Sequence, residues 1–272
     1  LVAKLANEDL TAYGKQRTTA LLKDCDEILY RYYTIAQGAL DLTLQGVGGI
    51  TAAHTAQSLS VAVTLSTNLP TETFIKTLVS NALIQGSPTA GWWSRQSLDT
   101  SFKFANEVRQ GLAQGETNTQ IIARIVGKSG NPGIMDISKR NAAALVQSSV
   151  QAVANASRLE TFRKNSDVIT ALQQLSTLDS HTSLTCISYS GMKWTGDGKP
   201  LDGALPFNGG PPRHWNCRSV LVPITKLSAF MPKGTRASEG GQVPSSTTFA
   251  EWLERRTPAQ QDEQLGVGRA QM

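Results

Sequence analysis

The apolar pattern of this chain changes at about residue 167. Before that point, apolar side chains recur at the three- and four-residue spacing of helices. One such stripe consists of Leu21, Cys25, Ile28, Tyr32 and Ile35. After that point, the runs VITALQQLSTL, LTCISYS, MKW and RSVLVPI are short, rich in β-branched or aromatic residues, and separated by the turn sequences GDGKP and PFNGGPP. The sequence therefore predicts an α+β fold, mainly helical at first and then built around short strands.

Three segments are expected along the chain. Residues 1–166 are predicted to form a helical docking domain, and residues 167–226 a small β-containing module. Residues 227–272 are predicted to form a connector rich in Gly, Ser and Pro, followed by a C-terminal helical segment.

Glycine, proline and capping residues divide the helical part. The first helix carries Cys25 as a core residue and is expected to end near residues 46–49, where three glycines lie. Further helical segments are expected at about 51–65, 74–82 and 92–111, with His54 in a packing or surface role. Thr117 and Gln120 form a capping-box signature before a small helix. The last long helix is expected to start at a cap provided by Asp136 or Ser138.

The composition limits the class of protein. The 272 residues carry 26 Lys+Arg against 21 Asp+Glu, and 40% are hydrophobic while only 17% are charged, which excludes a mainly disordered chain. No apolar run reaches the roughly 18 residues of a membrane span, and the N-terminus lacks the layout of a signal peptide. Because the chain does not begin with Met, it is expected to be a piece of a longer protein.

Cysteine and histidine residues gather in the β-containing module. The pairs His181-x4-Cys186 and His214-x2-Cys217 include two of the three cysteines and two of the three histidines. Structural zinc sites use four N or S ligands, commonly as two close pairs, and a metal could stabilise a module with a small core. The alternative is that Cys186 is an ordinary core residue and that the other pair lies in a loop. A catalytic pairing of Asp179, His181 and Cys186 is less well supported, because the sequence supplies no oxyanion hole.

The last long helix is locally basic. Residues 139–166 hold five basic side chains against one acidic side chain. The basic residues are Lys139, Arg140, Arg158, Arg163 and Lys164. Cations in the last turn complement the helix dipole, and the same cluster could instead bind a few DNA phosphates without sequence specificity.

Two blocks of the module carry a family resemblance. STLDSHTSLTCISYSGMKW and PPRHWNCRSVLVPI resemble the signature of tailed-phage head morphogenesis proteins, the minor head proteins of the phage Mu F-like type. The matching positions are Asp179, Thr182, Cys186, Gly191, Pro212, His214, Asn216, Cys217 and Arg218. A later run is also similar, at Trp252, Leu253, Gln261, Asp262, Leu265, Gly266 and Arg269, and so is the helix that carries Ala154, Arg158 and Glu160.

The resemblance implies a structural virion protein. Such a protein is present in few copies near the portal vertex, binds portal, major capsid or other head proteins, and acts in head assembly, genome packaging or DNA ejection. Packaged double-stranded DNA is a further expected partner, whereas a membrane is not. Cys186, His214 and Cys217 match positions that are often of metal-binding type in relatives. His181 stands where the family usually has Arg, so Asp179 is the rival fourth ligand.

Two other functions remain open. An ADP-ribosyltransferase would need a Glu-x-Glu pair, but Glu251 and Glu254 have the wrong spacing, so such activity would lie outside these residues. The helical half could also act mainly as a DNA-binding element of an ejected protein.

Overall fold

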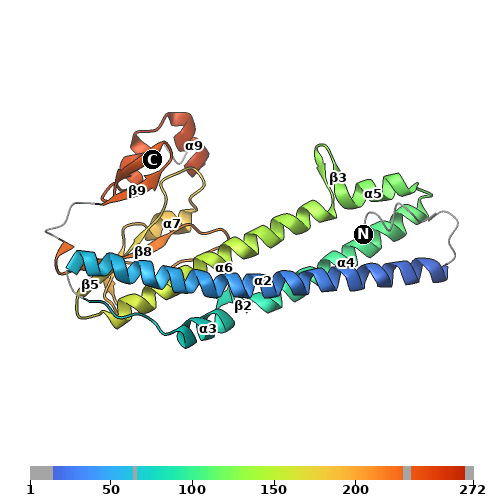
Figure 1. Ribbon diagram of the computed structural model, residues 1–272. Coiled ribbons are helices and arrows are strands. Elements are labelled where there is room, and N and C mark those ends of the chain that lie inside the picture. Colours follow the sequence, from blue (N-terminus) through green and yellow to red (C-terminus); the bar gives the residue numbers. More distant parts are fainter. Residues whose placement is uncertain (1–14, 64–65, 229–233, 267–272) are drawn as a thin grey trace. The chain divides into compact units, whose positions relative to one another are not determined.

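The computed structural model describes residues 15–63, 66–228 and 234–266 (Figure 1). The chain is α+β, as expected. The helices are α2 (Lys15–Val63), α3 (Glu72–Asn81), α4 (Thr89–Ala113), α5 (Asn118–Val126), α6 (Ile134–Lys164), α7 (Leu184–Tyr189), α8 (Phe249–Glu254) and α9 (Pro258–Leu265). The strands are β1 (Leu83–Ile84), β2 (Ser87–Pro88), β3 (Gly127–Lys128), β4 (Asn131–Pro132), β5 (Ile169–Leu175), β6 (Lys193–Trp194), β7 (Pro200–Leu201), β8 (Val220–Thr225), β9 (Thr235–Ser238) and β10 (Gly241–Pro244). Within the described ranges, no helix combines the length and apolar character of a membrane span.

The chain divides into two compact units that do not follow chain order. Unit 1 contains residues 1–44 and 80–149, and unit 2 contains residues 45–79 and 150–272. Residue 166, the expected end of a helical domain, lies inside unit 2, and the helical residues before it contribute to both units.

The core of unit 1 is formed by α2, α4 and α5. Its buried residues are Leu21, Leu22, Cys25, Phe104, Val108, Ile121 and Ile125. The core position of Cys25 is confirmed, since its side chain is fully buried. Leu21 is also buried as expected, but the last part of the expected stripe is wrong, because Tyr32 and Ile35 are 63% and 60% exposed while Leu29 is buried. The capping box of α5 is confirmed: Thr117 accepts a hydrogen bond from the backbone N–H of Gln120.

The first helix does not end at the glycines. Helix α2 continues through Gly46, Gly48 and Gly49 to Val63. A Cβ atom at Gly48 would lie 2.8 Å from Cγ2 of Ile75, a residue of α3 in the same unit. Gly48 is therefore a point of close packing rather than a helix stop. The last long helix also starts earlier than expected, at Ile134.

Unit 2 is built on a four-stranded antiparallel sheet with the strand order β7-β6-β5-β8. In the central strand β5, Leu172 lies opposite Trp194 of β6 on one side and Pro223 of β8 on the other. Leu172, Trp194 and Leu221 share a core with residues of α2 and α6. The expected strand LTCISYS is wrong: Leu184–Tyr189 is helix α7, with Ser183 as its N-cap.

The C-terminal segment of unit 2 is attached to the module by a buried arginine. Arg236 of β9 donates hydrogen bonds to the carbonyls of Ser176 and Thr247 and to the hydroxyl of Ser190. A parallel bridge between Leu178 and Ser238 adds backbone pairing. The β9–β10 hairpin therefore packs against the module instead of forming a free connector.

Candidate metal centre

The short helix α7 positions the first sulfur of the site. The hydroxyl of Ser183 accepts a hydrogen bond of 3.2 Å from the backbone N–H of Cys186, which fixes the first turn. Cys186 is 2% exposed, so its thiol faces the interior of unit 2. The β-branched residues that favoured a strand here are overridden by this cap and by the burial of Cys186.

A turn before β8 positions the other two donors. Asn216 adopts the left-handed conformation with a φ of 57°, which asparagine tolerates better than most residues. The backbone N–H of Cys217 donates to the carbonyl of His214 at 3.3 Å. This turn directs both side chains toward α7.

The three donor atoms converge. Sγ of Cys186 lies 3.1 Å from Nε2 of His214 and 3.6 Å from Sγ of Cys217. Among the residues that the structure describes, Cys186, His214 and Cys217 form a group whose ligand atoms all lie within 4.8 Å of one another. Distances of this size allow one metal ion to contact all three atoms.

The imidazole of His214 is oriented for this role. Its Nδ1 lies 2.7 Å from the carbonyl oxygen of Trp215. A carbonyl can only accept, so Nδ1 carries the proton and Nε2 keeps its lone pair toward the sulfurs. A backbone carbonyl behind the imidazole is a common arrangement in metal sites.

The two thiols have different acidities. A hydrogen bond from Cys186 lowers the pKa of Cys217 to about 5, with further help from the backbone N–H groups of Arg213 and Ser219. The same contact with Cys217, together with burial, raises the pKa of Cys186. One thiolate is therefore favoured near neutral pH, and thiolates are the form that binds metals.

Sequence reasoning missed Ser183 as a fourth group at this site. Its hydroxyl oxygen lies 2.8 Å from Nε2 of His214. The signal was present, since Ser183-x2-Cys186 repeats the spacing of His214-x2-Cys217. The adjoining cavity, which Ser183, Cys186 and His214 line in part, has a volume of only about 10 Å³, room for about one water molecule.

Neither rival for the fourth ligand belongs to the donor group. Both carboxylate oxygens of Asp179 accept hydrogen bonds from the guanidinium of Arg218, one of them at 2.7 Å. His181 is exposed, and its backbone N–H donates to Asp179 at 3.0 Å. His181 does line the small cavity beside Cys186. Asp179 therefore holds Arg218 in place, and His181 stays at the rim.

A buried polar network supports the centre from behind. The hydroxyl of Ser176 donates to the carbonyl of Cys186 at 2.9 Å and lies 2.9 Å from the hydroxyl of Ser219. Asn155 of α6 donates to the carbonyl of Ser219 at 3.3 Å. This network links α6, the end of β5 and both cysteine-bearing segments, so the donor positions are fixed by buried contacts.

The basic residues of α6 are divided between the units. Lys139 and Arg140 are exposed in unit 1, whereas Arg158, Arg163 and Lys164 belong to unit 2. A guanidinium nitrogen of Arg163 lies 4.0 Å from a carboxylate oxygen of Glu160. The side chain of Arg158 is half-buried.

Comparison with known proteins identifies the central part of the chain. Residues 102–222 match the family described as phage Mu protein F like protein. Over these residues the chain is similar to the phage Mu F-like family. No curated protein and no solved structure matches the chain significantly.

The F-like region, residues 102–222, begins within α4 and ends within β8. It contains Ser183, Cys186, His214 and Cys217, so the whole donor group lies inside it. The similarity expected at Trp252 and beyond is not part of the match, and Arg269 lies outside the described residues.

Proposed function

We propose that the protein is a structural minor head protein of a tailed bacteriophage, located in the virion near the portal vertex. In this role it binds portal, major capsid or other head proteins during head assembly, genome packaging or DNA ejection. The observation that carries the proposal is the match of residues 102–222 to a family of phage head morphogenesis proteins. A protein of this kind acts through binding surfaces, and α2 and α6 supply long helical surfaces for that purpose.

Zinc is the metal that best suits the donor group. Two thiols and an imidazole are the borderline-soft ligands typical of structural zinc sites. When bound, zinc would supply a cross-link between α7 and the turn before β8. Cys186, His214 and Cys217 would hold it, and a water molecule or the side chain of Ser183 would complete four ligands.

The centre suits a structural role better than a catalytic one. A nucleophilic cysteine needs access to its substrate, but Cys186 and Cys217 are only 2% and 1% exposed. The adjoining cavity of about 10 Å³ holds no substrate larger than water.

Contact with packaged DNA is a secondary part of the proposal. Lys139 and Arg140 on the exposed surface of α6 could each neutralise a phosphate. Binding to duplex DNA should then be weak, should fall steeply with added salt, and should weaken further in the double variant Lys139→Gln/Arg140→Gln. Affinity that is independent of salt would exclude this mode.

The experiment that tests the proposal is made on phage particles. Mass spectrometry of purified virions should find the protein at a few copies per particle, and affinity capture on the full chain should retain portal or another head protein. Absence from virions together with failure to retain any head protein would refute the proposal.

A further inference from the structure

Unit 2 contains a second site, on the side of the sheet where α2 and α6 cover β8. A cavity of about 250 Å³ opens between these elements. Its floor is formed by Leu59, Phe162 and Leu221, all nearly fully buried. The metal donors do not line this cavity.

Arg158 of α6 lines the cavity without an acidic partner. Its guanidinium donates to the side-chain oxygen of Asn155 at 3.2 Å, and within the described residues it forms no ion pair. Burial lowers the pKa of Arg158, which reflects the cost of holding a charge away from water. A half-buried cation of this kind is stabilised by any anion that reaches it.

The rest of the lining also favours an anion. His54 and Ser58 of α2 are exposed at the rim, and Thr225 and Ser228 bring two more hydroxyls from the opposite side. None of the described residues that line the cavity is acidic. The lining therefore has a net positive charge at Arg158, while its hydroxyls bond within the protein: Ser58 donates to the carbonyl of His54, and Ser228 lies 3.0 Å from the hydroxyl of Thr225.

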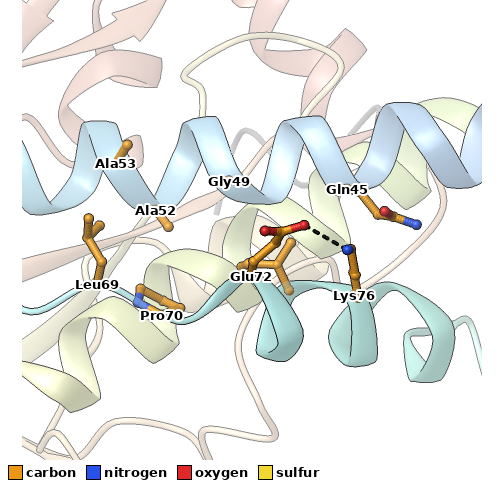
Figure 2. A pocket seen from close by; sticks show the side chains of 9 residues that line it. Gln45, Gly49, Ala52, Ala53, Leu69, Pro70, Glu72 and Lys76 are labelled. Carbon is orange, nitrogen blue, oxygen red and sulfur yellow. Dashed lines mark ion pairs between the residues drawn. The ribbon is translucent and has the colours of Figure 1, made fainter.

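A second groove in unit 2 differs from the Arg158 cavity in its charge. The groove between α2 and α3 is lined by small and apolar residues such as Gly49, Ala52 and Leu69, and its volume is about 390 Å³ (Figure 2). Its two charged residues neutralise each other, since Nζ of Lys76 lies 2.7 Å from Oε1 of Glu72. That groove has nothing that selects a charged ligand, whereas the Arg158 cavity combines an apolar floor with a net positive lining.

We infer that the Arg158 cavity binds a partner protein through an apolar side chain that stands next to a carboxylate, such as the C-terminal residue of a peptide. The apolar side chain packs on Leu59 and Phe162, and the carboxylate pairs with Arg158. The cavity is slightly smaller than the ~300–1,000 Å³ of small-molecule sites, which suits one side chain with its adjoining carboxylate.

Duplex DNA fits this cavity less well. A DNA backbone needs several cations spread along an open surface, and phosphates bring no apolar group for the floor. Among the described residues of the lining, Arg158 is the single Lys or Arg, and it is half-buried.

The test uses the full chain and two probes that differ in one charge. N-acetyl-leucine, with a free carboxylate, is titrated against N-acetyl-leucinamide, and amide chemical shifts of the protein are followed by NMR. The acid should bind at least about tenfold more tightly, since a hydrogen-bonded charge pair gives a factor of that order.

Ser58→Glu should abolish this preference, because it places a carboxylate at the rim of the cavity. Gln57→Glu adds the same charge to α2 at an exposed residue outside the lining and should leave binding unchanged.

A direct variant completes the test. Arg158→Gln should lose the preference for the acid, and its melting temperature shows whether the fold is kept. If Arg158→Gln unfolds, the result for Ser58→Glu tests the inference instead. Ser58 is exposed, so this substitution should leave the fold intact. Equal binding of acid and amide, no binding of either, or shifts at the cavity caused only by a 12-base-pair DNA duplex would each overturn the inference.

Discussion

The hydroxyl oxygen of Ser183 lies 2.8 Å from Nε2 of His214, on the side of the imidazole that faces the thiol of Cys186. A hydroxyl therefore lies beside two of the three donor side chains, where a stronger donor could act as the fourth ligand. Because a neutral serine hydroxyl is a much weaker zinc ligand than a thiolate, the site is built from three strong donors and one weak group.

Ser183→Cys should tighten zinc binding by more than about tenfold. The new sulfur would stand near Nε2 of His214 and Sγ of Cys186 and would complete a set of three thiols and one imidazole. Competition with a chromogenic chelator measures the affinity. Ser188→Cys adds a thiol on the exposed side of α7 and should leave the affinity unchanged. Equal affinities for the two variants would remove Ser183 from the site.

Cys217→Ser should lower both the zinc content and the melting temperature. The purified protein is expected to carry about one equivalent of zinc, and removal of one of three strong donors weakens a metal that stabilises the folded module. Elemental analysis and thermal melts provide the measurements. Cys25→Ser is the matched control: it also replaces the sulfur of a buried cysteine by oxygen and should lose stability, but it lies in unit 1 and should keep the full zinc content. A metal-free wild type whose stability is unaffected by Cys217→Ser would contradict the zinc proposal.

Much of the site could be predicted from the sequence. The clustering of Cys186, His214 and Cys217 predicted that these residues would meet, and the structure brings them together. The fourth position could not be predicted in the same way. Asp179 is not free to bind a metal because it forms an ion pair with Arg218, a tertiary contact that sequence spacing does not reveal. Ser183 is easily overlooked because serine is first of all a helix cap.

In the fold, too, features set by neighbouring residues were predicted correctly, whereas features set by tertiary contacts were not. The cap of α5 is a local feature of Thr117 and Gln120, and the sequence predicted it correctly. Helix α7 was predicted as a strand because its β-branched residues favour one, and burial of Cys186 decides otherwise. The burial of Leu29 in place of Tyr32 depends on tertiary packing, which periodicity along one helix cannot fix.

Asp179→Asn should destabilise the protein by about 2 kcal/mol at neutral pH, because hydrogen bonds to charged groups are worth about 1.5–3 kcal/mol. Burial would raise the pKa of Asp179, but the hydrogen bonds from Arg218, Thr182 and the backbone of His181 outweigh it and lower the pKa below its ordinary value.

The lowered pKa of Asp179 gives this contribution a pH dependence. The unfolded chain takes up the proton first as the pH falls, so the contribution is complete above the unfolded pKa of about 3.9 and is lost below it. Urea unfolding of wild type and Asp179→Asn should therefore converge as the pH is lowered from 7 to about 2.5. A constant difference across this range would show that Asp179 acts by packing alone.

Gly46→Ala and Gly48→Ala should have opposite effects, although the two residues lie two positions apart on α2. A Cβ atom at Gly46 meets no atom within 4 Å, so alanine should raise the free energy of unfolding by about 0.5–1 kcal/mol through helix propensity. A Cβ atom at Gly48 would lie 2.8 Å from Cγ2 of Ile75 and 3.4 Å from Cγ1 of Val153. Both neighbours are buried and β-branched, so they cannot rotate away freely, and overpacking should cost about 1–3 kcal/mol.

Chemical denaturation of the two variants measures the difference directly. If Gly48→Ala were as stable as Gly46→Ala, α3 would not pack closely on α2 at this point, and Gly48 would be an ordinary helical residue.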